Sequence, residues 1–149
     1  MRAVVQRVKS ASVSIAGYNI SEIDCGFLIF LGVDKNDVQK DLDYVVNKTI
    51  NLRIFKDEQY NMNLSIKEFG GEALVVSQFT LCASTSRGRR PSFINAADPK
   101  IAELIYKQFC TKLKEGGIHV QTGRFGAMME VSLINDGPVT IFLDSRDRG

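Results

Sequence analysis

The chain has 149 residues, 44% of them hydrophobic and 24% charged, which fits one globular domain over residues 1–149 with a core large enough to fold unaided. No apolar run approaches the roughly 20 residues of a membrane span, and charges interrupt the first segment before a signal-peptide core could form, so we expect a cytoplasmic protein with no membrane contact. The net charge of +2 is too small to predict nucleic-acid binding through the field of the whole molecule.

The first third of the chain predicts strands and one helix. Apolar and polar residues alternate over 4–8 and again over 11–15, which predicts two strands that could form a hairpin. The apolar run 25–33, bounded by glycines, predicts a strand buried on both faces. Asp37 is placed to cap a helix whose apolar residues recur at intervals of three and four: Val38, Leu42, Val45, Val46, Ile50 and Leu52.

A second helix has clearer boundaries. Strands at 53–55 and 72–79, separated by a turn at 57–61, precede it. Asp98 is a natural N-cap, Pro99 suits the first turn, and two glycines at 116 and 117 end the helix. Its predicted buried stripe consists of Ile101, Leu104, Ile105, Phe109 and Leu113.

Strands at 118–122, 128–134 and 139–143 complete the pattern, with a turn at 135–138 between the last two. The sequence therefore predicts an α+β fold in which mixed and antiparallel strands form a barrel-like β-sheet covered by two main helices. Open strand edges favour pairing with a second copy, so we expect a two-fold homodimer.

The cysteines and the histidine offer little for metal or nucleophilic chemistry. Cys25, Cys82 and Cys110 are widely separated, without the paired spacing of a zinc site, and we interpret them as reduced, small hydrophobic residues. His119 lies at a predicted strand start, where a structural role at or near the surface is expected, although a Ser-His-Asp triad would have to use it. We predict no metal and no cofactor.

Two segments differ from ordinary strand ends. In Ser77-Gln78-Phe79-Thr80, an apolar strand runs directly into two hydroxyls and an amide, which either cap the strand or bind a ligand. Residues 135–140 contain Gly137-Pro138, a plausible cis peptide bond, although a simple hairpin turn fits the same composition.

Basic residues cluster in one predicted loop. Arg87-Gly88-Arg89-Arg90 places three guanidinium groups within four residues, and Arg124, Arg146 and Arg148 add to the count. These groups are suited to phosphate, but a solvated loop explains the pattern equally well.

Taken together, these motifs resemble the D-aminoacyl-tRNA deacylase family of bacteria and eukaryotes along essentially the whole chain. The family's two signature motifs are intact at 77–80 and 135–140. The resemblance extends to further segments, at 1–8, 30–33, 62–64, 87–93 and 122–125, while the charged tail 145–149 is slightly longer than in many members.

The resemblance implies hydrolysis of the ester that links a D-amino acid to tRNA, with glycyl-tRNA as a second substrate. It implies a homodimer in which a cis Gly137-Pro138 segment enters the partner's pocket, where its carbonyl oxygens hold the substrate's α-amino group. Arg7 resembles the arginine that braces those carbonyls. Phe125 and Met129 resemble residues of the pocket for the terminal adenosine, although core packing is the simpler interpretation of both.

The catalytic step implied by the resemblance involves Ser77, Gln78, Phe79 and Thr80. Backbone N–H groups around Phe79 and Thr80 would stabilise the oxyanion, although the Phe79 ring could simply be a core residue. The Thr80 hydroxyl could be a nucleophile, but no base adjoins it. We favour activation of water by the 2′-hydroxyl of the terminal adenosine. The alternatives are a non-catalytic tRNA-binding module and a small-molecule esterase that uses Thr80.

Overall fold

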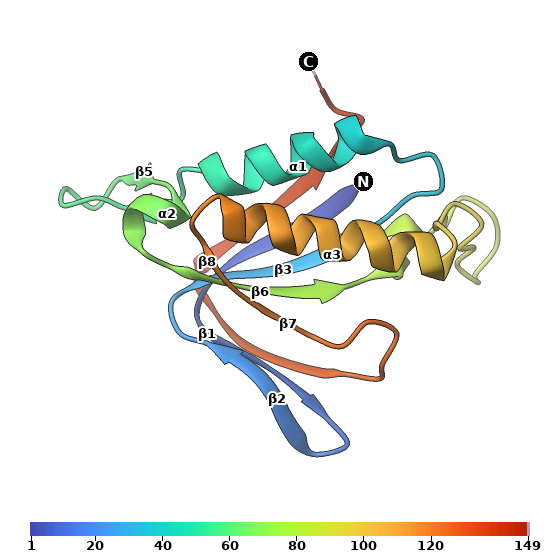
Figure 1. Cartoon of the computed structure of the whole chain (residues 1–149), viewed down its shortest axis with the longest axis horizontal. Coiled ribbons are helices and arrows are strands. Elements are labelled where there is room, and N and C mark those ends of the chain that lie inside the picture. Colours follow the sequence, from blue (N-terminus) through green and yellow to red (C-terminus); the bar gives the residue numbers. More distant parts are fainter. Residues whose placement is uncertain (149) are drawn as a thin grey trace.

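The computed structural model describes residues 1–148, which form a curved sheet with two long helices across one face (Figure 1). The helices are α1 (Gln39–Asn51), α2 (Ile66–Phe69) and α3 (Pro99–Glu115), and a 3-10 turn, η1, spans Phe79–Cys82. The strands are β1 (Arg2–Ile15), β2 (Tyr18–Ile23), β3 (Gly26–Gly32), β4 (Phe55–Lys56), β5 (Met62–Leu64), β6 (Glu72–Ser77), β7 (His119–Thr122) and β8 (Glu130–Asp144).

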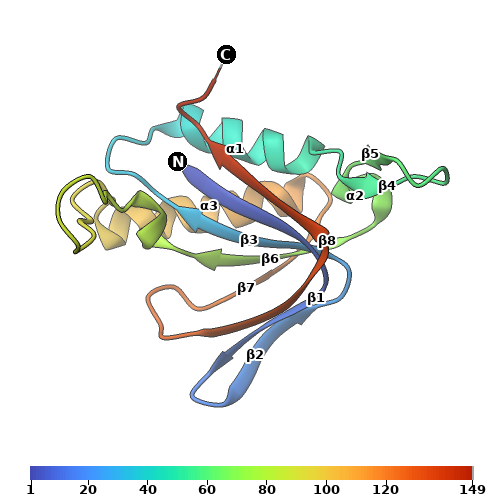
Figure 2. The ribbon, with the colours of Figure 1, turned by 180° about the vertical axis from the view of Figure 1, so that it is seen from behind.

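The main sheet mixes parallel and antiparallel pairs. Its order is β2-β1-β3-β6-β7, with β8 also paired to β1, and β3, β6 and β7 run parallel to one another. The sheet curls into a nearly closed barrel (Figure 2), so the predicted α+β fold with a barrel-like sheet and two main helices is confirmed. In the described part of the chain, no helix is both long enough and apolar enough to span a membrane.

Two clusters of buried apolar side chains pack on the two faces of the sheet. One lies between the sheet and helices α1 and α3 and contains the fully buried Phe27, Leu42 and Phe109. The other lies on the opposite face and contains Val13 and Leu28. Each fully buried side chain of this size contributes about 1.5–3 kcal/mol relative to an exposed one. Because β3, β6 and β7 run parallel to one another, their carboxyl ends lie at the same edge of this packed sheet.

The sequence predicted four short strands where the structure has two long ones. Segments 4–8 and 11–15 belong to the single strand β1, and segments 128–134 and 139–143 belong to the single strand β8. The two strands pair along most of their length, with register shifts on either side of Val8. The segment 135–138 is therefore not a hairpin turn: residues 136–139 form a bulge within β8, and the ladder resumes at Thr140.

The predicted N-terminal cap was correct for α3 and wrong for α1. In α3, the Asp98 carboxylate accepts the Lys100 N–H at 3.0 Å and Pro99 begins the helix, as predicted. Asp37 does not cap α1, since its carboxylate accepts the Asp34 N–H at 2.7 Å and contacts the amino group of Met1. The residue before α1 is Val38, whose N–H donates to the Asp41 carboxylate at 2.9 Å.

Three residues predicted for buried helix faces are exposed. They are Val38, which precedes α1, and Ile101 and Leu104 in α3, with exposed fractions of 61%, 55% and 62%. Phe109 and Leu113 of the predicted stripe are buried, and Tyr106 lies with them on the face of α3 that packs on the sheet. Leu104 lies about 140° around the helix axis from Phe109, so it points away from the sheet.

The cysteines fall into two environments. Cys82 and Cys110 are buried, and burial raises the pKa of both thiols, that of Cys110 to about 11, which fits the predicted role as small apolar residues. Cys25 is exposed, so the packing role predicted for it was wrong. His119 is exposed at the start of β7, as predicted.

Candidate active site

The first signature segment forms where β6 leaves the sheet. The Gln78 N–H donates to the Leu31 carbonyl of β3 at 2.8 Å. The chain then tightens into η1 through a hydrogen bond from the Leu81 N–H to the Gln78 carbonyl at 3.2 Å. The Thr80 hydroxyl accepts a hydrogen bond from the Gln78 side-chain amide and does not cap the strand. Phe79 is 57% exposed, so it is not a core ring.

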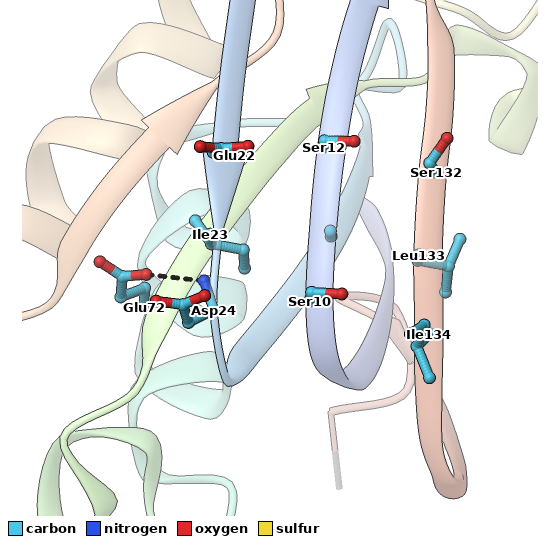
Figure 3. A pocket seen from close by; sticks show the side chains of 10 residues that line it. Ser10, Ser12, Glu22, Ile23, Asp24, Glu72, Ser132, Leu133 and Ile134 are labelled. Atoms are coloured by element: carbon cyan, nitrogen blue, oxygen red, sulfur yellow. Dashed lines mark hydrogen bonds between the residues drawn. The ribbon is translucent and has the colours of Figure 1, made fainter. Parts of the chain in front are cut away.

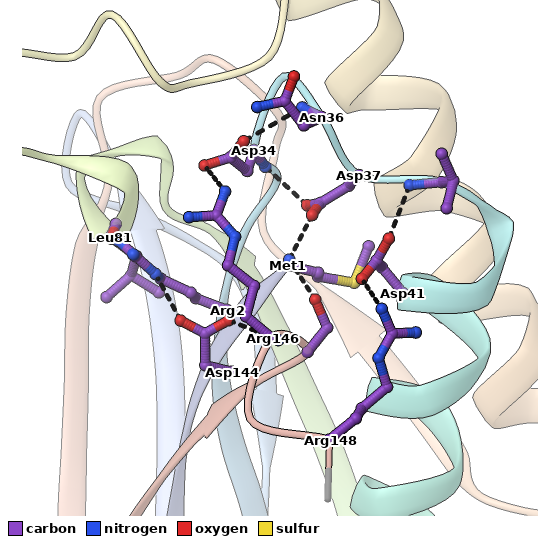
Figure 4. Close-up of polar contacts among 12 residues, drawn as sticks. Met1, Arg2, Asp34, Asn36, Asp37, Asp41, Leu81, Asp144, Arg146 and Arg148 are labelled. Atoms are coloured by element: carbon purple, nitrogen blue, oxygen red, sulfur yellow. Dashed lines mark hydrogen bonds and ion pairs between the residues drawn. The ribbon is translucent and has the colours of Figure 1, made fainter.

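Contacts from outside the motif position this turn. A Cβ at Gly32 would lie 2.9 Å from the Gln78 carbonyl oxygen and 2.9 Å from the Leu81 Cβ, so only glycine lets η1 pack this closely. Arg2 donates from Nη1 to the Leu81 carbonyl at 2.7 Å and from Nε to the Asp144 carboxylate at 3.0 Å (Figure 4). Arg2 has no sequence signal for this role, because no local pattern connects the first strand with residue 81.

The tail arginines, predicted to add to the basic cluster, bind acidic groups of their own chain. Arg146 pairs with the buried Asp34 at 2.6 Å, and Arg148 pairs with the buried Asp41 at 2.9 Å (Figure 4). Burial alone raises the pKa of Asp41, but hydrogen bonds from the Val38 N–H and Ser145 and the charge of Arg148 bring it below its ordinary value. These guanidinium groups are therefore occupied within the fold.

Phe125 and Met129 lie in the connection between β7 and β8, at the same sheet edge as the turn. The Gly123 N–H donates to the Val75 carbonyl at 3.0 Å, and a Cβ at Gly123 would lie 2.7 Å from the Met129 sulfur. The Phe125 ring packs against Tyr106 with centroids 5.8 Å apart. Both predicted pocket residues are half-buried, so each packs on the core and keeps one side accessible.

The second signature segment is the bulge in β8, which its own side chains stabilise. Asn135 donates to the Thr140 hydroxyl at 2.9 Å and accepts the Val139 N–H at 3.2 Å, so the first and last residues of the motif close it. The Gly137-Pro138 bond is cis, as the resemblance implies. Gly137 has φ +128, and a Cβ there would lie 2.8 Å from the Val139 side chain, so glycine is required.

Arg7 lies beneath this bulge with only 4% of its surface exposed. Its Nε donates to the Asp136 carbonyl at 3.2 Å, and its Nη1 donates to the Ile54 carbonyl. A Cβ on Gly137 would lie 3.0 Å from Arg7 Nη2. Arg7 thus braces the carbonyl that precedes Gly137, one residue earlier than the resemblance implies.

Within one chain, the turn and the bulge lie at the levels of opposite ends of β6. The bulge lies opposite Arg7, which pairs with Phe27 and through it with Ala73, whereas Ser77 pairs with Leu31 at the far end of β6. Four residues of strand separate these positions, a distance of about 13 Å. His119, which pairs with Glu72, is about 16 Å along the sheet from Ser77, so it cannot serve Thr80 as a base in the same chain.

A polar cleft of about 520 Å³ lies between β1, β2 and β8 (Figure 3). It contains none of the predicted site residues, and three carboxylates line it: Glu22, Asp24 and Glu72. These acidic groups disfavour a polyanion such as RNA. Within residues 1–148, no three His, Cys, Asp or Glu side chains are grouped so as to hold a metal ion.

Comparisons with known proteins agree on one family. Residues 4–144 match the model of the D-Tyr-tRNA(Tyr) deacylase family. A D-aminoacyl-tRNA deacylase from Desulfatibacillum aliphaticivorans is 51% identical over 146 residues, which cover 98% of this chain and 100% of that relative.

Solved structures show the same fold. One named c-Myc DNA Unwinding Element Binding Protein has a TM-score of 0.91 at 41% identity and covers 97% of this chain and 98% of that chain. A probable eukaryotic D-amino acid tRNA deacylase has a TM-score of 0.83 at 16% identity over 96% of this chain and 98% of its own, a likeness of fold alone. The family match and the sequence identity together show that this chain belongs to the D-Tyr-tRNA(Tyr) deacylase family.

Proposed function

We propose that this chain hydrolyses the ester bond of D-aminoacyl-tRNA in the cytoplasm, releasing the free D-amino acid and tRNA. As a member of its family, it is a hydrolase that acts on ester bonds. The observation that carries the proposal is that both signature segments leave regular strand pairing and present main-chain groups, at η1 and at the β8 bulge. Main-chain recognition is independent of the side chain, so one enzyme can clear many D-amino acids after a synthetase has erred.

The complete site requires two chains. The turn and the bulge of one chain are about 13 Å apart along the sheet, too far to contact one aminoacyl group from both sides. β8 pairs only with β1 among the described strands, and its Ile134 and Phe142 are 58% and 56% exposed. An open edge with exposed apolar residues favours a homodimer in which the bulge of one chain faces the turn of its partner.

The bulge supports a chiral filter. Residues 136–139 form no ladder pairs with β1, which leaves the Gly137 and Pro138 carbonyl oxygens as acceptors for the substrate's α-ammonium group. Held in this way, a D-amino acid directs its side chain away from the backbone, whereas an L-amino acid directs it into the backbone. Glycine has no side chain to exclude, so glycyl-tRNA is a second substrate.

The turn supplies the oxyanion donors. Among the hydrogen bonds of residues 1–148, none uses the N–H of Phe79 or Thr80, so both remain available to the carbonyl oxygen of the ester. The Thr80 hydroxyl has the Gln78 amide as its partner, with no base beside it. This favours activation of the attacking water by the 2′-hydroxyl of the terminal adenosine. Phe125 and Met129 would contact the adenine base.

Paired hydrolysis assays test the activity. Purified protein is incubated with D-tyrosyl-tRNA, L-tyrosyl-tRNA and glycyl-tRNA, and the fraction of tRNA still esterified is followed with time. We expect rapid loss of the D and glycyl esters and preservation of the L ester. Equal rates for the D and L esters contradict the chiral filter, and binding of tRNA without any hydrolysis indicates a tRNA-binding module instead.

The role of the 2′-hydroxyl has a direct test. D-tyrosyl-tRNA ending in 2′-deoxyadenosine keeps the 3′ ester but lacks the neighbouring hydroxyl. A positioned acid or base contributes about 10²- to 10⁴-fold, so hydrolysis of the deoxy substrate should be slower by that factor. Equal rates on the two substrates, or turnover of simple D-amino-acid esters that lack a ribose, contradict assistance by tRNA.

A further inference from the structure

A basic loop follows the catalytic turn directly. Residues 84–92, here called the arginine loop, begin two positions after the end of η1 and form the yellow-green loop at the right of Figure 1. Hydrogen bonds of 2.8 and 2.9 Å between the backbones of Ser84 and Ser92 close the loop at its base. The proposed function does not use this loop, although it contains the densest group of cations in the sequence.

The charge of the arginine loop is not neutralised by its surroundings. Arg87, Arg89 and Arg90 are exposed, and the segment from residue 73 to residue 97 contains no Asp or Glu. Among the ion pairs of residues 1–148, none includes these three arginines, whereas both tail arginines are paired with buried aspartates. The loop therefore keeps a local charge of +3 in a protein whose net charge is +2.

The base of the loop is held at the sheet edge that carries Thr80. The Lys35 N–H donates to the Asn95 carbonyl at 2.9 Å, and the Ala97 N–H donates to the Val33 carbonyl at 3.0 Å, so the segment after the loop is attached to the chain that leaves β3. The Phe93 ring lies edge-on to the Phe79 ring, with centroids 5.0 Å apart and planes at 68°. This contact joins the end of the loop to the start of η1.

We propose that the arginine loop binds backbone phosphates of the tRNA acceptor end while the terminal ester occupies the site at η1. The inference rests on the proposed function, because an ester at Thr80 places the adjoining nucleotides next to residues 84–92. Arginine suits this role, since its planar group donates two parallel hydrogen bonds to a phosphate. The acidic cleft between β1, β2 and β8 would repel the same chain of phosphates.

A charge-matched pair of variants tests the inference. The first is Arg87→Gln/Arg89→Gln/Arg90→Gln. The control, Lys56→Gln/Lys67→Gln/Lys114→Gln, removes the same charge from exposed positions on β4, α2 and α3. Both are assayed on D-tyrosyl-tRNA and on 3′-O-D-tyrosyl-adenosine, which has the ester and the base but no phosphate.

Three single-strand phosphate contacts contribute a slope of about −2 to log(kcat/KM) plotted against log salt concentration. Without these contacts, kcat/KM of the loop variant should be about 100-fold lower at about 0.1 M salt. We expect this loss on D-tyrosyl-tRNA, a slope shallower by about 2, and an unchanged rate on D-tyrosyl-adenosine. The control should retain wild-type rates on both substrates, apart from a small uniform effect of net charge.

Two outcomes overturn the inference. Equal rates of the loop variant and the control on D-tyrosyl-tRNA show that the loop does not bind the acceptor end, and a comparable loss on D-tyrosyl-adenosine shows that the loop only supports η1. Failure of the wild type to hydrolyse D-tyrosyl-tRNA rejects the proposed function instead. In that case the affinities of both variants for deacylated tRNA still decide the role of the loop. If the loop binds phosphate, the affinity for tRNA falls in the loop variant and not in the control.

Discussion

The turn at 77–82 and the bulge at 135–140 both interrupt strand pairing, but different parts of the chain hold them in place. The bulge is closed by its own first and last residues, Asn135 and Thr140, and Arg7 braces it from the neighbouring strand. The turn is positioned by distant contacts, the bare Cα of Gly32 and the guanidinium of Arg2. The conformation of a segment that stabilises itself can be inferred from the local sequence, whereas that of a segment positioned by distant residues cannot.

The largest effect is expected at the centre of the bulge. In Gly137→Ala, the new methyl group meets Val139 and Arg7 at a φ of +128, so the carbonyl pair moves. Loss of one preorganised polar group of this kind lowers kcat/KM about 10²- to 10³-fold, and discrimination between D and L esters should fall as well. The measurement is hydrolysis of D- and L-tyrosyl-tRNA, with unfolding in urea as a check on the fold.

Gly17→Ala is the matched control for this substitution. Gly17 has φ +83, but a Cβ there has no neighbour within 4 Å. Both substitutions place a side chain at positive φ, at a backbone cost of about 1–3 kcal/mol, whereas activity should fall only at Gly137. Full activity in Gly137→Ala contradicts the assignment of the bulge to substrate binding.

Arg7→Met tests the buried guanidinium that braces the bulge from β1. The substitution leaves the Asp136 and Ile54 carbonyls without their charged donor, at a cost of about 3 kcal/mol in the free energy of unfolding. If about 2 kcal/mol of that cost falls on the bulge, kcat/KM drops about 30-fold. Asp136→Asn keeps Arg7 and loses only a half-exposed ion pair, so a comparable loss of activity in both variants contradicts a bracing role.

Arg2→Met tests the outside support of the turn. Without the Arg2 donor, the Leu81 carbonyl is no longer held and the N–H groups of Phe79 and Thr80 shift. We expect kcat to fall about tenfold, or about 1.4 kcal/mol, with little change in KM. Asp144→Asn keeps the Arg2–Leu81 bond and should retain kcat, so steady-state kinetics of the two variants separate positioning of the turn from loss of the ion pair.

Thr80→Ala should have a smaller effect. If water is activated by tRNA, the hydroxyl only positions groups around it, and the single-turnover rate should fall less than tenfold, about 1.4 kcal/mol in the barrier. Removal of a true nucleophile costs several orders of magnitude. Thr80→Ser keeps the hydroxyl and serves as the control, and a complete loss in Thr80→Ala with rescue in Thr80→Ser establishes a nucleophile.

The smallest effect concerns stability in acid. Burial by itself raises the pKa of Asp144, but hydrogen bonds from the Arg146 N–H and Arg2 bring it below its ordinary value. A carboxyl group with a lowered folded-state pKa contributes stability that is complete above about pH 4 and is lost as the pH falls through the lowered value. In Arg2→Met this loss should shrink, as measured by urea unfolding between pH 5 and pH 3. An unchanged pH dependence contradicts the coupling.

The sequence predicted the second helix well and the long strands poorly. Asp98, Pro99 and the glycines at 116 and 117 act through bonds within one helical turn, so their signals are local. The continuity of β8 depends on its pairing with β1 across more than 100 residues of chain, which no window of sequence contains. Asp37 has the chemistry of a cap, but the buried amino group of Met1 and the Asp34 N–H hold it instead.

The sequence by itself determined the two main helices, the residues of most long strands and the two signature segments, because turns, caps and strand alternation depend on neighbouring residues, but it did not predict β2, β5 or α2. Only the tertiary structure decided that the turn and the bulge lie at the levels of opposite ends of β6, that Arg2 supports the turn, and that the tail arginines bind buried aspartates while those of the loop remain exposed. The physical reason is that strand register and ion pairing depend on which distant segments meet, and folding alone brings those segments together.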